Sequence, residues 1–585
     1  MKKISTLLLA LFSAQFLPAQ NSVPPETGTF PYSAKDGNFP RAEPLREIDT
    51  PTVVKASDFG AIPDDGKCDR AALQKAIDTL KKRGNVKLLL EKGTYDIIEF
   101  GDRDRNSQAL RIDGAENFVL DGNGAKILMH KPLNKFIYSH NCKNTIIRNL
   151  VLDNSIRPAS FGKVVDTGKD SMNYVDVEIF DGYPTPDEEM FTSTAKSSFC
   201  YFLDEKNPPR HAPGTYGNYS VGKVEHLEAR KYRIYISNRG DKQMAKTKAG
   251  MLWRNSARNG NNAVSIYAAE NFTCQNIIIN SSNAGAFAGS RCLNLNFLNC
   301  RIEPAAGEIF STNADGFHMA NNRNGVWMEK CYVKGVGDDT MNTYKLGIFL
   351  HERLGARTFK TGVKVRNNEP PRKTPSDMFE NGDDVVLFTG GDGKIIFRAK
   401  VAGFDKKTGA ITLDKDVPEI PLGFDKMKST TIYNVSRGKG TVILDCVFED
   451  NFRYGVFLKT SNVLIENCKF IAQSAEAIAA FNEAGWPEGF LAENVTIRDT
   501  LFKDCGFYGS YEESPKAATI VFACEHQKQP PAQRKNIWLE NNTIEGWNKA
   551  ALRIMYADNV TLKNNTIGKP SPRSPNKDNP VIIVK

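Results

Sequence analysis

A short motif recurs along this chain and limits the folds that it can form. Each copy is an alternating apolar run, then usually Asn or Asp, then a small residue and another apolar position. The copies are residues 294–302, 326–333, 442–448, 463–470, 495–502, 537–544 and 560–567. The closest copies begin about 21 to 23 residues apart and others about 32 apart, which is typical of a β-solenoid. Because alternation sends every second side chain inward and Asn or Asp marks a bend, the sequence predicts an all-β, right-handed parallel β-helix.

The cysteines follow the same repeat. There are eleven, an odd number, and Cys300, Cys331, Cys446 and Cys468 occupy the same position in four of the copies. Small apolar side chains at equivalent positions are expected to stack inside successive coils, whereas a disulfide framework would not repeat in register. No Cys-x-x-Cys pair or Cys/His cluster with zinc spacing occurs, so we predict no metal site.

The first 20 residues have the features of an export signal. Met1-Lys2-Lys3 is basic, residues 7–16 are apolar, and small residues near Ala19 favour cleavage there. No later stretch is long and apolar enough to cross a bilayer, so we expect a soluble protein exported from a bacterium, either periplasmic or secreted.

The net charge of +9 on 585 residues is too small to indicate a nucleic-acid partner. The sequence does not indicate an oligomeric state.

Changes in pattern divide the mature chain into several regions. Residues 21–52 form a lead-in rich in Pro and Gly, and an amphipathic helix at residues 71–80 is expected to cap the first coil. Two segments lose the coil pattern but keep alternating strands, and long unstructured loops are uncommon, so each predicts an inserted antiparallel, barrel-like β subdomain. The predicted order is coils at 53–160, the first insertion at 161–254, coils at 255–345, the second insertion at 346–437 and coils at 438–585. Because the second insertion begins just after Asn342, it is expected to wall the active site.

Three acidic residues lie about one coil apart. Asp315 belongs to Asn313-Ala-Asp-Gly-Phe-His318, and Asp338 and Asp339 belong to Gly337-Asp-Asp-Thr340. Hydrolysis of a glycosidic bond by inversion needs one protonated carboxyl to donate to the leaving oxygen and one carboxylate to activate water. Crowded carboxylates cannot all ionise cheaply, so one keeps its proton while the others act as bases. The spacing therefore predicts a hydrolytic site with the three aspartates as its catalytic residues, with about 6.5 to 9.5 Å between acid and base.

These motifs resemble those of known β-helix enzymes. The opening Phe59-Gly-Ala61 with Asp64-Asp-Gly66 and the capping helix is similar to the start of the pectin-lyase-like superfamily. The Asn313-Ala-Asp-Gly316 and Gly337-Asp-Asp339 motifs are similar to the catalytic motifs of the polygalacturonases, glycoside hydrolase family 28. The Gly-His-Gly motif of that family is not evident, and its Arg-Ile-Lys motif has only a loose counterpart ending at Lys459.

Nearly the whole chain more closely resembles glycoside hydrolase family 110, the exported bacterial α-1,3-galactosidases. The resemblance rests on Arg157-Pro-Ala-Ser-Phe-Gly162, the two insertions, Ala314-Asp-Gly-Phe-His-Met319 and Gly337-Asp-Asp-Thr340. It implies an inverting, exo-acting α-galactosidase that needs no cofactor and removes terminal galactose from blood-group-B-type glycans.

By resemblance to the polygalacturonases, Asp338 is the expected proton donor, while Asp315 and Asp339 hold the water. Trp486 is a candidate stacking platform for the apolar face of galactose, and Glu483 is a candidate acceptor for its hydroxyls. The predicted substrate-binding residues are Asn313, His318, Asn342, Arg453, Lys459, Asn482, Glu483 and Trp486.

Two other hypotheses remain open at this stage. A polygalacturonase-like hydrolase would need cations to hold a uronate carboxylate, and Arg453 and Lys459 are candidates for that role. A calcium-dependent polysaccharide lyase, or a glycan-binding β-helix without catalysis, would use the aspartates to hold Ca²⁺ instead of protons.

Overall fold

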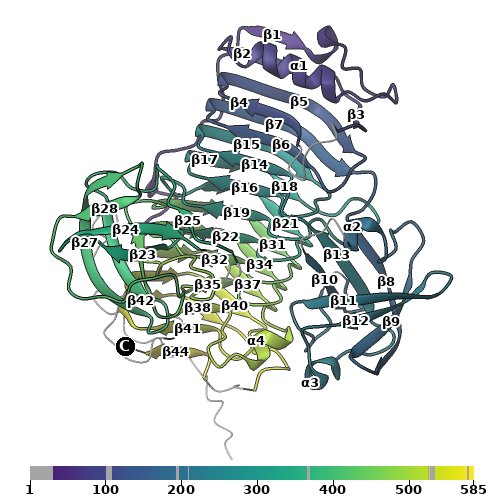
Figure 1. Ribbon diagram of the computed structural model, residues 1–585. Coiled ribbons are helices and arrows are strands. Elements are labelled where there is room, and N and C mark those ends of the chain that lie inside the picture. The colour runs from purple at the N-terminus through teal and green to yellow at the C-terminus, as the bar shows by residue number, and fades with distance from the viewer. Residues whose placement is uncertain are drawn as a thin grey trace, which may run out of the picture.

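The computed structural model describes residues 31–100, 108–192, 197–208, 210–364, 369–524, 526, 534–575 and 579–584. The expected signal peptide at residues 1–20 lies outside the described residues. The described chain forms a parallel β-helix with two inserted antiparallel barrels, as Figure 1 shows, which confirms the predicted fold class.

The faces of the β-helix are parallel sheets in which each strand pairs with its equivalent in the next coil. One sheet of twenty strands includes two faces of each coil. Its strands are β1 (Thr52–Lys55), β2 (Val86–Leu89), β3 (Thr94–Ile97), β5 (Glu116–Met129), β7 (Lys143–Asn154), β15 (Glu270–Ile279), β17 (Leu293–Leu298), β18 (Arg301–Ile302), β20 (Trp327–Glu329), β21 (Tyr332–Lys334), β30 (Thr441–Leu444), β31 (Val447–Glu449), β33 (Val463–Glu466), β34 (Lys469–Ile471), β36 (Val495–Arg498), β37 (Leu501–Lys503), β39 (Arg534–Glu540), β40 (Thr543–Glu545), β42 (Ala557–Lys563) and β43 (Thr566–Ile567).

A second parallel sheet of eleven strands forms the remaining face, and the two aspartate motifs adjoin it. Its strands are β4 (Gln108–Asp113), β6 (Lys135–His140), β14 (Val264–Tyr267), β16 (Phe287–Ser290), β19 (Phe317–Ala320), β22 (Met341–Tyr344), β32 (Val456–Leu458), β35 (Ile478–Ala480), β38 (Ile520–Phe522), β41 (Leu552–Met555) and β44 (Val581–Val584).

The repeated Asn residues form ladders at the bends between faces. Asn276 has a φ of 51°, in the left-handed region that Asn tolerates better than most residues. Its Nδ2 donates to Oδ1 of Asn149 at 2.9 Å, and Nδ2 of Asn299 donates to Oδ1 of Asn276 at 2.8 Å. The Asn in each motif therefore both makes the bend and joins one coil to the next.

The predicted cysteine stack lies inside these coils. Cys300, Cys331, Cys446 and Cys468 are buried. They follow strands β17, β20, β30 and β33, which pair with one another in that order. All eleven cysteines are free thiols. The inward position of the motif cysteine is therefore confirmed, and it belongs to the main hydrophobic core.

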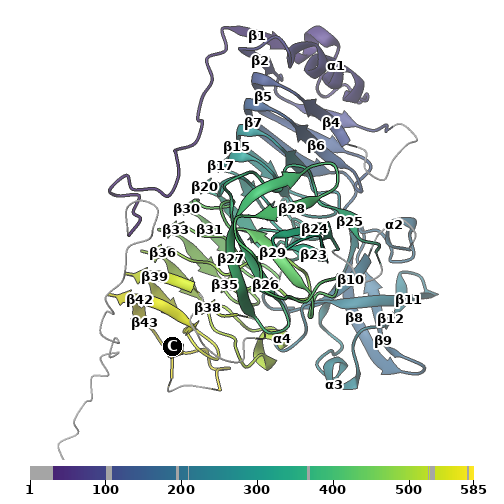
Figure 2. The same ribbon diagram turned by 60° about the vertical axis from the view of Figure 1, so that its left-hand side comes forward.

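The N-terminal end of the β-helix is covered by a helix, as the amphipathic pattern predicts. A short 3-10 helix, η1 (Ala56–Phe59), precedes α1 (Arg70–Leu80), which buries Leu73, Ala76, Ile77 and Leu80. Figure 2 shows the lead-in segment running along the outside of the coils. There the Phe39 ring packs 4.7 Å from that of Trp327, and Arg41 donates to the carbonyl of Gly325 at 2.6 Å.

The two insertions are both closed by strand pairing, and Figure 1 shows them on either side of the coils. The first barrel comprises β8 (Ala159–Lys169), β9 (Asn173–Ile179), β10 (Ser197–Leu203), β11 (Tyr219–Glu228), β12 (Lys231–Ile236) and β13 (Leu252–Arg258), with helices α2 (Glu189–Thr192) and α3 (Asp241–Met244). The second comprises β23 (Ile348–Arg353), β24 (Thr358–Val363), β26 (Asp384–Thr389), β27 (Lys394–Asp405), β28 (Ala410–Leu413) and β29 (Thr430–Asn434), with β25 (Arg372–Lys373) added to β24.

A further helix, α4 (Gly509–Glu513), lies in the C-terminal coils. Within the described residues, no helix is both long and apolar enough to span a membrane.

Candidate active site

The three aspartates meet just before two neighbouring coils enter the second parallel sheet, at β19 and β22. β19 and β22 pair in register, with Phe317 opposite Met341, and the Gly316 amide donates to the carbonyl of Asp339 at 2.9 Å. One carboxylate oxygen from each of Asp315, Asp338 and Asp339 lies within 4.8 Å of the others. The predicted meeting of the three acids is therefore present, although they lie closer together than the expected 6.5 to 9.5 Å.

The glycines of both motifs allow this close approach. A Cβ on Gly316 would lie 2.5 Å from the carbonyl oxygen of Thr340, and one on Gly337 would lie 2.8 Å from that of Asn313. Both distances are too short for a side chain, so the coils need glycine here to stack at their present spacing.

Two arginines hold Asp338. Nη1 of Arg258, at the end of β13, donates to Oδ2 at 3.0 Å, and Nη1 of Arg453 donates to Oδ1 at 3.3 Å. Burial alone would raise the pKa of Asp338, but the two guanidinium groups outweigh it and hold the pKa below its ordinary value. The ionised form of this carboxyl is therefore favoured.

Asp339 has the opposite electrostatic environment. Its side chain is almost completely buried, and its Oδ1 has no hydrogen-bond partner among the described residues. Burial, together with the charges of Asp338, Asp315 and Glu483, raises the pKa of Asp339 well above its ordinary value although Arg453 lies nearby. The proton shared by the two adjacent carboxyls therefore resides mainly on Asp339, and the pair titrates as a unit.

His318 forms an ion pair with Asp315. Its Nδ1 contacts Oδ2 of Asp315, and its Nε2 lies 3.0 Å from the hydroxyl of Tyr344. Burial lowers the pKa of His318, but the Asp315 carboxylate outweighs this and raises it to about 9. At neutral pH the imidazole is therefore protonated, with Nδ1 donating to the aspartate and Nε2 donating to the tyrosine.

A hairpin at residues 483–488 forms another side of the site. Glu483 accepts from Nη2 of Arg453 at 3.2 Å and lies 3.4 Å from Nζ of Lys459. Nζ of the same lysine lies 3.3 Å from Oε2 of Glu488, which also accepts from Nδ2 of Asn342 at 3.4 Å. Lys459 is fully buried below the two glutamates, so it holds the hairpin in place and does not face the cavity.

These groups surround a cavity of about 610 Å³, a size common for small-ligand sites. Its lining includes Asp315, His318, Asp338, Asn342, Arg453, Glu483 and Trp486 among the predicted site residues. Trp486 is 45% exposed, so much of its indole is available for a ligand.

The first barrel forms the opposite wall of the cavity. Phe199 and Tyr201 of β10, Arg258 of β13 and Arg239 all line it. The expectation that the second insertion walls the site was wrong, because no described residue of β23 to β29 belongs to this lining. The second barrel instead supports the hairpin from behind, where Nζ of Lys426 donates to the carbonyl of Gly485 at 2.8 Å and lies over the Trp486 ring.

Two predicted binding residues do not fit a direct role with substrate. Asn313 is fully buried, and its Nδ2 donates to the carbonyls of Pro158 and Ala257 at 2.7 and 2.9 Å. Its Oδ1 accepts from Arg254, so its side chain joins the first barrel to the coil. Asn482 is also buried and does not line the cavity.

Sequence reasoning missed Arg239, Arg258, Tyr344 and Glu488. Arg258 ends a strand of an insertion and has no local motif that relates it to Asp338. Glu488 carries a weak signal, since it follows Trp486 in the same break from the coil pattern as Glu483.

Comparisons with known proteins agree with the fold class and with a glycoside hydrolase activity. Residues 426–523 match a family model described as a right handed beta helix region. The chain is 22% identical to alpha-1,3-galactosidase B of Bacteroides thetaiotaomicron, covering 89% of this chain and 87% of that protein. It is 23% identical to alpha-1,3-galactosidase A of Bacteroides fragilis, covering 88% and 87%. Among solved structures it is similar to the A-module of the Azotobacter vinelandii mannuronan C-5 epimerase AlgE4, with a TM-score of 0.39, 13% identity and coverage of 89% and 98%.

The fold, the clustered carboxyls and these relatives together define a glycoside hydrolase built on a parallel β-helix. More particularly, the chain is similar over most of its length to bacterial proteins named α-1,3-galactosidases, in agreement with the resemblance found in the sequence.

Proposed function

We propose that this protein is an exo-acting, inverting α-1,3-galactosidase of glycoside hydrolase family 110. The observation that carries the proposal is the aspartate cluster, in which two arginines lower the pKa of Asp338 while burial raises the pKa of its neighbour Asp339. Neighbouring carboxyls whose pKa values are shifted in opposite directions can supply the acid and the base that hydrolysis of a glycosidic bond needs. The galactoside specificity is supported by the relatives, which the chain matches along nearly all of their length.

In the proposed reaction, Asp338 gives its proton to the glycosidic oxygen because it is the member of the acidic pair that faces the cavity. The free site holds that proton mainly on Asp339, so the proton must shift to Asp338 before donation. Asp315, held by His318, and Asp339, once ionised, position the attacking water. The proton lost by this water returns to the aspartate cluster, which regains its starting number of protons. The products are galactose and a shortened glycan.

Recognition of galactose is assigned to the hairpin side of the cavity. The Trp486 indole offers a flat apolar surface for the sugar ring, while Glu483 and Glu488 present carboxylate oxygens to its hydroxyls. Because Arg453 and Lys459 already hold these glutamates, the acceptors are fixed in place before substrate binds. The proposed natural substrates are blood-group-B-type glycans with a terminal α-1,3-linked galactose.

Inversion is supported by the family resemblance, while the short distances between the carboxyls do not match the separation common in inverting enzymes. The experiment is therefore proton NMR of the first product formed from a terminal α-1,3-galactoside. We expect β-galactose to appear first, followed by slow mutarotation. Initial release of the α anomer would contradict inversion, and no release of galactose would contradict the activity.

A polygalacturonase-like activity is the second candidate, because Arg239 lines the cavity and makes no ion pair with a described residue. Polygalacturonate should be included in the same assay, and we expect it to remain intact.

A calcium-dependent reaction is less compatible with the site, because Arg258 and Arg453 already neutralise the carboxyls that would bind the ion. Activity should therefore persist in a chelator.

A further inference from the structure

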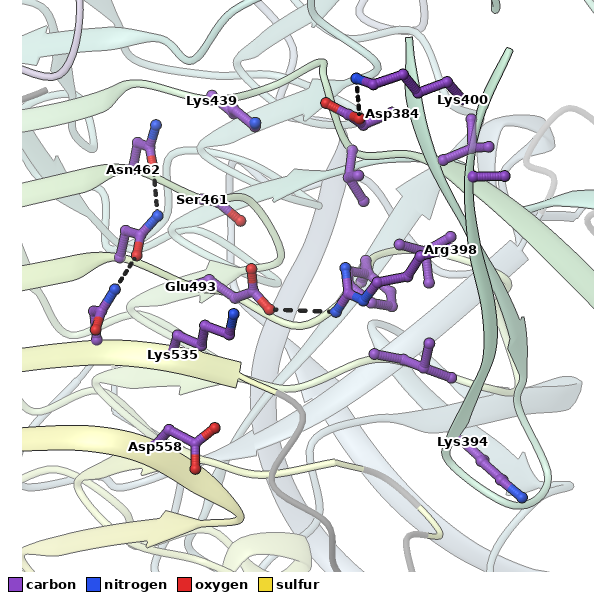
Figure 3. A pocket seen from close by; sticks show the side chains of 18 of the residues that line it. Asp384, Lys394, Arg398, Lys400, Lys439, Ser461, Asn462, Glu493, Lys535 and Asp558 are labelled. Atoms are coloured by element: carbon purple, nitrogen blue, oxygen red, sulfur yellow. Dashed lines mark hydrogen bonds and ion pairs between the residues drawn. The ribbon is translucent and has the colours of Figure 1, made fainter. Parts of the chain in front are cut away.

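A second cavity of about 600 Å³ lies between the second barrel and the C-terminal coils, apart from the aspartate cluster. Figure 3 shows side chains of β26 and β27 on one side and those of the coils on the other. Phe490 and Glu493, which line it, follow directly after the hairpin that lines the candidate active site. The two cavities therefore lie at opposite ends of one segment, residues 483–494.

The lining of this second cavity carries more positive than negative charge. Its six basic residues are Lys394, Arg398, Lys400, Lys415, Lys439 and Lys535, and its four acidic residues are Asp384, Asp414, Glu493 and Asp558. Two of the acids are paired within the cavity, Asp384 with Lys400 at 2.6 Å and Glu493 with Arg398 at 3.8 Å. Lys394, Lys415, Lys439 and Lys535 make no ion pair with a described residue, so the cavity retains ammonium groups for an anionic ligand.

A buried lysine lies behind this wall. The Lys345 side chain is almost completely buried, and its Nζ has no hydrogen-bond partner in the described part of the chain. Burial and, to a smaller extent, the nearby charge of Lys439 lower its pKa to about 8, although Glu493 acts in the opposite direction. Positive charge is thus concentrated on this side of the cavity. An anionic ligand would reduce the unfavourable electrostatic energy of these like charges.

The remaining lining suits a sugar chain better than a simple ion. Ser461 offers a hydroxyl, while Asn462, Asn494 and Asn536 offer amides on successive coils, about 4.8 Å apart. The amides form a ladder, with Nδ2 of Asn494 donating to Oδ1 of Asn462 and Nδ2 of Asn536 donating to Oδ1 of Asn494, both at 2.8 Å. Apolar side chains, including Phe490, line the cavity beside this polar strip.

We propose that this cavity is a second, non-catalytic glycan-binding site, selective for an oligosaccharide that carries carboxylate or sulfate groups. The lysines would bind the acidic groups, the Asn ladder the hydroxyls, and the apolar side chains the faces of the sugar rings. An acidic stretch of a larger glycan would thereby be held beside the segment whose other end forms the galactosidase cavity. The site is independent of which glycosidic bond the enzyme cleaves.

Isothermal titration of the full-length exported protein with trigalacturonate tests this, in the presence of saturating galactose to occupy the aspartate cavity. Galactotriose is the neutral probe and inorganic sulfate the small-anion probe. We expect trigalacturonate to bind at least tenfold more tightly than either, with an affinity that falls as salt rises. No binding of trigalacturonate, equal binding of galactotriose, or equal binding of inorganic sulfate would each overturn the proposal.

Paired variants locate the site. Lys439→Gln with Lys535→Gln should weaken trigalacturonate binding at least tenfold while leaving kcat/KM for a small α-galactoside unchanged. The matched control is Lys469→Gln with Lys503→Gln, which removes the same charge from exposed strand positions on neighbouring coils outside the cavity. Equal affinities for the two double variants would contradict the location.

Discussion

Nη1 of Arg258 donates to Oδ2 of Asp338 at 3.0 Å, although the two residues belong to different subdomains. The arginine is the last residue of the first barrel, and the aspartate lies in a coil of the β-helix. An inserted barrel therefore does more than narrow the cavity, because it also sets the charge state of a carboxyl in the candidate active site.

Replacement Arg258→Gln should shift the pH profile of kcat/KM to higher pH. Loss of the guanidinium removes a charge that lowers the pKa of Asp338, so the aspartate cluster would hold its protons to higher pH. Both the acidic and the basic limb of the profile should move to higher pH. Arg258→Lys, which keeps the charge, is the control. A profile that does not move would contradict the electrostatic role of Arg258.

Replacement of Asp315, Asp338 or Asp339 by Asn should each reduce kcat by at least about 10²-fold, since loss of a general acid or base typically costs about 10² to 10⁴. Asn has the same shape, so circular dichroism and thermal unfolding should show a folded protein. The turnover of terminal α-1,3-galactosides is the measurement. Near-normal turnover of Asp338→Asn would remove that residue from the donor role.

The ion pair between His318 and Asp315 should make stability depend on pH. The pKa of the histidine is about 9 in the folded protein and about 6.5 when unfolded. Because the folded-state pKa is raised, the stabilisation is fully present below about pH 6.5 and is lost as pH rises through about 9. The difference in unfolding free energy between wild type and His318→Gln, from urea titrations, should therefore shrink over that range. A constant difference would contradict the ion pair.

The coil bends give a prediction for the fold. Asn276 combines a left-handed backbone with ladder bonds to both neighbouring coils. Asn276→Ala and Asn276→Gly both lose the ladder bonds, but only alanine retains a Cβ that strains this backbone. We expect the alanine variant to be less stable than the glycine variant by about 1 kcal/mol, measured by denaturant unfolding. Equal stabilities would show that the ladder alone selects Asn.

The sequence predicts those features that the coil repeat itself determines. Cys300 and Asn299 could be placed because each belongs to a repeated position with a fixed direction relative to the core. Asp315 and Asp338 could be brought together because their motifs are separated by about one coil. Arg258 could not be found in this way, since its position depends on how a barrel docks on the coils, and no repeat encodes that contact.

The same distinction explains the misplaced residues. Asn313 opens the motif that contains Asp315, but its side chain attaches the first barrel to the coil through Arg254. Lys459 has the spacing of a substrate clamp, yet it is buried below Glu483 and Glu488. Motif spacing gives the coil on which a residue lies, while the docking of neighbouring elements decides whether its side chain reaches the cavity.

Removal of the indole at Trp486 tests how galactose is held. The ring is 45% exposed and lines the cavity, so Trp486→Ala should lower kcat/KM for terminal α-galactosides by an amount equivalent to about 1 to 3 kcal/mol, typical of a lost aromatic stacking contact. Trp486→Phe should recover part of this loss because it restores an aromatic face. Trp538→Ala, on β39 of the coils and outside this cavity, is the control for a tryptophan lost elsewhere. If Trp486→Ala retains full kcat/KM, the indole serves only to pack the hairpin against Lys426, and the sugar-binding surface must lie on the side formed by Phe199 and Tyr201.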